Sequence, residues 1–197
     1  MCGRYYIENE HTEEQLLEII EQARRKSPRP VATGEIYPGN VAAVVANSRA
    51  GKIVPFAMRW GYQPGGLRGS LIINARSETA AEKPIFADGV LRRRCLVPAS
   101  RYFEWAKSGD VKRKYAIAPK DAEFFAMAGI YRMDAQSDMP RFVILTREAC
   151  KDIAGIHGRM PVILPEREAG DWLNIDNDYR NVIARSQESM RFYEVMD

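Results

Sequence analysis

Most of the chain from residue 41 to residue 195 consists of short apolar runs typical of β-strands, and this pattern limits the fold more than any other feature. The runs are rich in β-branched and aromatic residues, and short turn-rich pieces separate them. Their close spacing does not fit a regular βαβ alternation. The expected strands cover residues 41–46, 53–60, 70–75, 94–99, 102–106, 114–118, 124–132, 141–146, 161–164 and 191–195.

A few segments carry helical patterns instead. Residues 12–26 form the clearest one, because Thr12 and Gln15 fit a capping box and an apolar stripe follows. Further helices are expected at 78–93, 147–155 and 165–173, with Pro165 suited to the first turn of the last. We therefore expect an α+β fold: one domain over residues 1–197 with a mostly antiparallel or mixed, barrel-like sheet and a few flanking helices.

The composition fits a folded protein away from membranes. The 197 residues are 46% hydrophobic, enough for a sizeable core. No apolar run approaches the roughly 20 residues of a membrane span, and the first residues do not resemble a signal peptide. We expect an intracellular protein, cytoplasmic and nucleoid-associated in a bacterium or nuclear in a eukaryote.

The three cysteines are Cys2, Cys95 and Cys150. Their odd number and wide separation argue against a disulfide framework, and no CxxC or HxxxH spacing predicts a metal site. Cys95 lies in an apolar run and is expected in the core, whereas Cys150 is expected on a short helix. No motif predicts a nucleotide or other cofactor.

The basic residues are unevenly chosen, with 21 arginines and 8 lysines in a chain of net charge +3. An arginine fork can hold a phosphate at two points, whereas lysine is a point charge. The bias is compatible with nucleic-acid binding, although composition alone favours an ordinary solvated surface.

Cys2 is a candidate nucleophile because of its place in the chain. If Met1 is removed, Cys2 carries a free amine and a thiol on adjacent carbons, a pair that is reactive toward aldehydes. A thiol beside a cation would also ionise more readily. The alternative is an ordinary cysteine that occurs early in the sequence.

Glu104, in the run YFEWA, is a candidate acid or base. Burial of a carboxylate is costly unless it is paired, and burial raises the pKa of the group toward the neutral range. Strand alternation puts Tyr102 and Glu104 on one face and Phe103 and Trp105 on the other. An exposed position on an edge strand is therefore the alternative.

Two further residues have a functional and a structural interpretation. His157 lies in a glycine-flanked loop and could carry protons, since an unperturbed histidine has a pKa of about 6.5. A structural loop histidine is the alternative. Trp60 follows an apolar strand; it would be a stacking platform for a nucleobase if exposed and a core residue if buried.

Six motifs together resemble one family. They are MCGRY, MRWGYQP, INARSETAAEKPIF, RRCLVPASRYFEW, FVILT and IHGRMPVIL, and they span residues 1–164. In this order they resemble the SOS response-associated peptidase (SRAP) domain, a family that captures abasic sites in single-stranded DNA covalently. Three places depart from the family pattern: EIYPGN at 35–40, the bulky residues before Glu104, and Gly158, where aspartate is common.

The resemblance implies a role for each matched residue. Cys2 would be the nucleophile, Asn74 would position the substrate, and Glu104 and His157 would manage protons. The implied contacts to DNA are Arg4, Pro38, Trp60, Arg76, Thr146 and Arg159. The partner would be single-stranded DNA containing abasic sites, and we expect the protein to act as a monomer without a cofactor.

The implied reaction uses both groups of Cys2. The amine forms a Schiff base with the ring-opened sugar, and the thiol closes a thiazolidine ring, giving a DNA–protein crosslink. Removal of Met1 by the protein itself is compatible with the same residues. Two other functions stay open: an N-terminal-nucleophile peptidase or amidase, and a non-catalytic module that binds single-stranded DNA.

Overall fold

The structure is a computed structural model that describes residues 2–8, 14–64, 70–109, 111–133 and 137–196. Its helices are α1 (Glu14–Lys26), α2 (Pro84–Arg92), α3 (Glu166–Leu173), α4 (Tyr179–Ala184) and the short 3-10 helix η1 (Ala80–Glu82). None of the described helices is long and apolar enough to cross a bilayer. The strands are β1 (Tyr5–Ile7), β2 (Gly34–Ile36), β3 (Val41–Asn47), β4 (Ile53–Trp60), β5 (Asn74–Arg76), β6 (Arg94–Ala99), β7 (Arg101–Ser108), β8 (Val111–Pro119), β9 (Phe125–Arg132), β10 (Arg141–Glu148), β11 (Arg159–Pro161), β12 (Ile163–Leu164) and β13 (Met190–Val195).

The strands form two sheets. The smaller sheet has the order β13-β8-β7-β1-β2, and its neighbours are antiparallel. The larger sheet has the order β11-β10-β4-β3-β6-β9-β12, with β5 paired to β10. Because β10 pairs with β9 as well as β4, the strands β10, β4, β3, β6 and β9 close into a ring. The predicted α+β class with a mixed, barrel-like sheet is confirmed.

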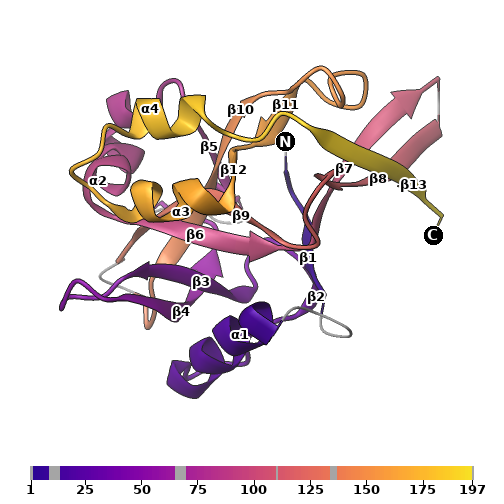
Figure 1. The fold of residues 1–197 in the computed structure, drawn as a ribbon. Coiled ribbons are helices and arrows are strands. Elements are labelled where there is room, and N and C mark those ends of the chain that lie inside the picture. The colour runs from indigo at the N-terminus through magenta and orange to yellow at the C-terminus, as the bar shows by residue number, and fades with distance from the viewer. Residues whose placement is uncertain (1, 9–13, 65–69, 110, 134–136, 197) are drawn as a thin grey trace.

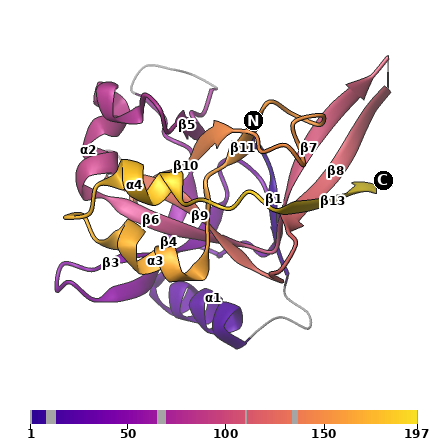
Figure 2. The ribbon, with the colours of Figure 1, turned by 45° about the horizontal axis from the view of Figure 1, so that its top comes forward.

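The helices and the smaller sheet lie on different sides of the molecule. Figures 1 and 2 show α2, α3 and α4 gathered over one side of the larger sheet, while the β7–β8 hairpin and β13 extend away from them. Helix α1 packs on β3 and β4. In both views the N-terminal end of the chain lies beside β11 and β7, which brings the start of the sequence to strands formed much later.

The buried side chains form two apolar clusters, and β10 contributes to both. Phe142 and Ile144 belong to the cluster that contains Cys2, whereas Val143 and Leu145 belong to the cluster beneath α2 and α3. Successive side chains of a strand point to opposite faces, so a strand buried on both faces reads as the continuous apolar run FVIL. The motif FVILT thus forms an interior strand.

Several predictions of secondary structure need correction. The helix expected at 147–155 is wrong: β10 continues through Glu148 and residues 151–156 form turns, so Cys150 is not helical. The chain must reverse there so that Pro161 can pair with Thr146. The strand expected at 70–75 is displaced to Asn74–Arg76, and the run 161–164 divides into β11 and β12.

Other predictions are confirmed or fall outside the described residues. Strands β3, β4, β6 and β13 lie within a residue of their predicted bounds, and α2 and α3 form where helices were expected. Pro165 caps α3 rather than lying in its first turn. Three elements were missed: β1, β2 and α4. The capping residue Thr12 lies outside the described residues.

Candidate active site

Cys2 is held against the smaller sheet at the start of β1. Tyr5 pairs with Tyr102 across β1 and β7, and the backbone N–H of Phe103 donates to the Arg4 carbonyl at 2.9 Å. The Cys2 side chain is fully buried, and its thiol lies 3.8 Å from the Arg4 carbonyl. The strand pairing therefore brings the second residue of the chain next to the motif that contains Glu104.

Asn74 holds the Cys2 backbone from the other sheet. Its side-chain N–H (Nδ2) donates to the Cys2 carbonyl at 2.8 Å. Asn74 itself is fixed on β5, opposite Ile144 of β10. Two residues that are 72 positions apart in sequence are thus directly joined, as the resemblance implied.

Trp60 supports Asn74 and does not face solvent. Its indole N–H donates to the carbonyl of Ile73 at 3.0 Å, immediately before Asn74. The ring is fully buried between Tyr5, at 5.1 Å, and Phe142, at 6.4 Å between ring centroids. This burial contradicts the expectation that Trp60 contacts nucleic acid and assigns it to the core.

Glu104 is buried near Cys2. Only 3% of it is exposed, and β7 lies between β8 and β1, so the alternative of an exposed edge-strand position is wrong. Burial raises the pKa of the Cys2 thiol far above its ordinary value, and the Glu104 carboxylate raises that pKa further. In the chain that still carries Met1, burial therefore opposes ionisation of the thiol, and the effect of a free Cys2 ammonium stays a prediction.

His157 and Arg159 lie on the other side of β10. The backbone N–H of Arg159 lies 2.9 Å from Nδ1 of His157, and the Arg159 carbonyl lies 3.1 Å from the same atom, so the main chain of Arg159 holds the ring. Strand β10 has Arg76 of β5 opposite Thr146 on one side and Pro161 of β11 opposite the same residue on the other. The site thus extends from Cys2 across β5 and β10 to β11.

Arg159 is paired within the protein. Its guanidinium contacts both oxygens of Glu78, at 2.7 and 2.9 Å, and donates to the Thr146 carbonyl at 2.7 Å. The hydrogen bond from Arg159 lowers the pKa of Glu78 and outweighs the opposing effect of burial. Thr146 is fully buried and its carbonyl holds Arg159, and its contact with DNA stays a prediction.

Arg4 lies between two aromatic rings, neither of which was predicted to belong to the site. The guanidinium is 4.4 Å from the centre of Tyr37 and 5.0 Å from the centre of Trp105, and it pairs with Glu35 at 3.2 Å. Trp105 is on the face of β7 opposite Glu104, and it is part-exposed. An aromatic residue directly after the candidate acid was the signal that could have identified it.

Two lysines extend this cluster along β8. Lys114 pairs with Glu35 at 3.0 Å and lies 4.4 Å from the centre of Phe103, while Lys112 lies 5.4 Å from the centre of Trp105. Burial alone would raise the pKa of Glu35, but Lys114 and Arg4 outweigh it and lower that pKa. We call Arg4, Tyr37, Trp105, Lys112 and Lys114 the basic-aromatic cluster.

The remaining predicted contacts are exposed. Arg76 ends β5, and Pro38 lies in the turn between β2 and β3, next to Tyr37. Gly39 completes that turn with φ +88°, a conformation that favours glycine. The segment EIYPGN, which departs from the family pattern, therefore supplies an exposed proline and one ring of the basic-aromatic cluster.

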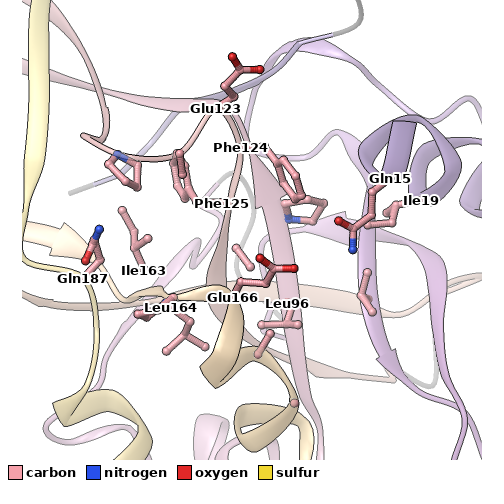
Figure 3. A pocket seen from close by; sticks show the side chains of 18 of the residues that line it. Gln15, Ile19, Leu96, Glu123, Phe124, Phe125, Ile163, Leu164, Glu166 and Gln187 are labelled. Atoms are coloured by element: carbon pink, nitrogen blue, oxygen red, sulfur yellow. The ribbon is translucent and has the colours of Figure 1, made fainter. Parts of the chain in front are cut away.

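A separate cavity lies away from these residues. It has a volume of about 610 Å³, and Figure 3 shows Phe124 and Phe125 projecting into it while Gln15 reaches it from α1. Leu96, Leu164 and Glu166 also line it, but none of the predicted site residues does. Within the described part of the chain, no three His, Cys, Asp or Glu side chains are grouped to hold a metal.

Comparison with known proteins agrees with this geometry. A model of the SOS response associated peptidase (SRAP) family matches residues 1–197. The chain belongs to the SRAP family. Two relatives are named abasic site processing proteins. The first, YoqW of Bacillus subtilis, is 32% identical to this protein, and the match covers 99% of this chain and 92% of the YoqW chain. YedK of Escherichia coli is 29% identical over 88% of this chain and 79% of its own.

Solved structures show the same fold. A crystal structure of a protein from Bacteroides thetaiotaomicron superimposes with a TM-score of 0.77 and 24% identity, covering 100% of this chain and 93% of that one. A second, from Bordetella bronchiseptica, has a TM-score of 0.76 and 21% identity, covering 99% of this chain and 100% of that one. The likeness to both structures extends over the whole fold of this chain.

Proposed function

We propose that this protein captures abasic sites in single-stranded DNA by forming a covalent bond through Cys2 once Met1 is removed. The observation that carries the proposal is the joining of Cys2 to Asn74 beside the buried Glu104. Family membership and the names of the curated relatives support the same substrate.

The first step uses the amine of Cys2. Loss of Met1 would free it, and an α-amine has an ordinary pKa of about 7.7–8.0, so a minority is uncharged and nucleophilic at neutral pH. The amine adds to the aldehyde of the ring-opened sugar, and loss of water gives a Schiff base. Glu104 is close enough to affect the Cys2 thiol electrostatically and is suited to accept a proton from the ammonium.

The second step uses the thiol. The sulfur adds to the imine carbon, the C=N electron pair moves to nitrogen, and a five-membered thiazolidine closes. The two groups belong to one residue, so their effective concentration is high. The buried thiol resists ionisation in the free protein, and the positive charge of a protonated imine would favour its ionisation at the moment it is needed.

Asn74 and His157 would assist these steps. Asn74 fixes the Cys2 backbone through a single hydrogen bond of 2.8 Å and so orients the reacting residue. The main chain of Arg159 holds the imidazole of His157 at Nδ1, and the ring is suited to donate or accept a proton during sugar opening and loss of water.

The basic-aromatic cluster, with Arg76 and Pro38, would bind the DNA strand. Aromatic faces stack on bases and guanidinium groups contact phosphates, which gives binding with little sequence preference and strong salt dependence. Trp105 takes the stacking role that was expected of Trp60. Arg159 would contact phosphate only after it separates from Glu78.

The test uses wild-type protein and Cys2→Ala with single-stranded DNA that carries one abasic site. A denaturing gel and the intact mass of the shifted band report a covalent adduct and the presence of Met1. We expect an adduct lacking Met1 in wild type and none in Cys2→Ala. Binding without an adduct in both would contradict the proposal and favour a non-catalytic DNA-binding module.

A parallel assay addresses the competing enzymatic function. Mass spectrometry of freshly made wild type, Cys2→Ala and Glu104→Gln, in a host lacking methionine aminopeptidase activity toward the chain, reports whether Met1 loss depends on the site. Turnover of small peptide amides without any DNA adduct would favour an N-terminal-nucleophile amidase over abasic-site capture.

A further inference from the structure

Tyr102 carries a buried hydroxyl group that the steps above do not use. Its side chain is fully buried on β7, directly opposite Tyr5 of β1, which is also fully buried. Neither hydroxyl has a hydrogen-bond partner among the described residues. Native proteins satisfy most buried polar groups, so two such hydroxyls beside a reactive cysteine require an explanation.

The two tyrosines have different surroundings. Tyr102 lies two residues before Glu104 on the same face of β7, and Cys2, Glu104 and Cys150 all act on its hydroxyl electrostatically. Tyr5 shares only Cys2 with it; its other neighbours are Cys95 of the core and the ring of Trp60. Both hydroxyls are in the core near Cys2, but only that of Tyr102 also has Glu104 acting on it.

Tyr102 is also close to the loop that carries His157. Cys150 begins this loop: its carbonyl accepts from the N–H of Ala154 at 3.0 Å, and the carbonyl of Ile153 accepts from the N–H of His157 at 3.2 Å. The hydroxyl thus lies near Cys2, Glu104 and Cys150, and Cys150 directly precedes the turns that lead to His157.

We propose that Tyr102 is a further catalytic residue, whose hydroxyl donates a hydrogen bond to the oxygen of the substrate aldehyde as the Cys2 amine adds to it. This assignment rests on the proposed function. In that step the nitrogen lone pair forms the C–N bond, and the C=O electron pair moves to oxygen. The nitrogen gives up two protons in all and the oxygen gains two, one to form the hydroxyl of the carbinolamine and one as it leaves as water. A fixed donor in a water-poor site stabilises the charge that develops on that oxygen.

The surroundings of Tyr102 suit this role. Burial, followed by Cys2 and Glu104, raises the pKa of its phenol well above the ordinary value, so the group stays protonated and able to donate. A hydroxyl that awaits a substrate oxygen has no partner before the substrate arrives. The substrate therefore supplies the acceptor that the described residues lack.

The test compares Tyr102→Phe with Tyr5→Phe as a matched control. Each variant removes one buried hydroxyl without a partner from the same pair of strands, so both should fold. With abasic single-stranded DNA, we expect Tyr102→Phe to slow single-turnover crosslinking by about 10- to 100-fold, and Tyr5→Phe to stay within about twofold of wild type. Affinity for a strand with a tetrahydrofuran site, which has no aldehyde, should be unchanged in both.

A second measurement isolates the amine step. Cys2→Ser keeps the α-amine but has no thiol, and borohydride traps its Schiff base. Adding Tyr102→Phe to this variant should slow borohydride trapping by about the same factor as it slows crosslinking. If Tyr102 only positioned the thiol, trapping in the variant without a thiol would not slow. The assignment would be overturned if Tyr102→Phe left both the trapping rate and the crosslinking rate unchanged. It would also be overturned if Tyr5→Phe slowed crosslinking as much as Tyr102→Phe does.

The two proposals can fail separately. A wild-type protein that forms no adduct would overturn abasic-site capture, and the role of Tyr102 with it. A wild-type adduct together with an unaffected Tyr102→Phe would overturn only the role of Tyr102.

Discussion

The Asn74 side chain makes a single hydrogen bond to Cys2, and this bond can be tested against an equivalent one elsewhere. Asn74→Ala should cost about 1 kcal/mol of stability and slow crosslinking, because Cys2 loses its fixed position. Asn47→Ala is the control: its Nδ2 donates to the Leu173 carbonyl at 2.7 Å, remote from Cys2. It should cost similar stability in thermal unfolding and leave the crosslinking rate unchanged.

Glu78 occupies the guanidinium of Arg159 and so competes with any phosphate. Glu78→Gln should raise the affinity for single-stranded DNA by about two- to fivefold at low salt, and the gain should shrink as salt screens the phosphates. Asp138→Asn removes a comparable ion pair with Arg29, at 2.6 Å, and should have no such effect. Fluorescence anisotropy over a salt series distinguishes them; weaker binding by Glu78→Gln would show that the pair orders the site.

Strand β5 depends on Trp60, whose indole N–H holds the residue before Asn74. Trp60→Phe keeps an aromatic ring in the core but loses that hydrogen bond, so we expect about 1–2 kcal/mol lower stability and slower crosslinking. Trp172→Phe is the matched control. Trp172 belongs to the other apolar cluster, and its buried indole N–H donates to the Cys95 carbonyl at 2.9 Å. Unchanged affinity for DNA in Trp60→Phe would agree with a buried, supporting role for Trp60. A large loss of affinity would instead favour the earlier prediction that Trp60 contacts DNA directly.

The sequence predicted the long elements and missed the short ones, for a physical reason. A run such as 41–46 or 94–99 is a short, mostly apolar segment between turn or helix signals, which is enough to predict a buried strand locally. Strand β1 has three residues, and it forms because β2 and β7 pair with it on either side. The helix expected at 147–155 does not form because β11 pairs with β10, and this long-range contact cannot be predicted from the local sequence pattern.

The site shows the same limit. Residue types and motif order were enough to select Cys2, Asn74, Glu104 and His157, and the structure joins the first two directly. Partners could not be predicted, because Glu78 and Arg159 are 81 positions apart. Trp60 and Thr146 were assigned to DNA from the resemblance, and burial assigns Trp60 to support instead.

At the level of the whole molecule, two sheets hold the site together, and ion pairs bridge segments far apart in the sequence. Glu35 of β2 joins Arg4 of the N-terminal segment to Lys114 of β8, and Glu78 joins β5 to β11 through Arg159. Both carboxylates have a lowered pKa in the folded protein, despite the opposing effect of burial. Their ion pairs therefore link the stability of the fold to pH.

The sign of this dependence follows from proton binding. A carboxylate whose pKa is lower in the folded than in the unfolded chain binds its proton first in the unfolded chain as the pH falls. Its contribution is complete above the ordinary value, 4.5 for glutamate, and is lost as the pH falls through the lower folded value. Glu35 should contribute more than Glu78, because its side chain is 25% exposed against 48%.

Urea unfolding of wild type and Glu35→Gln between pH 7 and pH 3 measures this contribution. The variant should be less stable than wild type at pH 7, and the difference should shrink below about pH 4.5, where wild type also loses the ion pair. Glu78→Gln should also be less stable than wild type at pH 7, and this difference should also shrink at low pH. The difference should be smaller than for Glu35→Gln, since water screens the Glu78–Arg159 pair more. A difference that stays constant to pH 3 would mean that Glu35 acts through packing, and that Arg4 is held by Tyr37 and Trp105 alone.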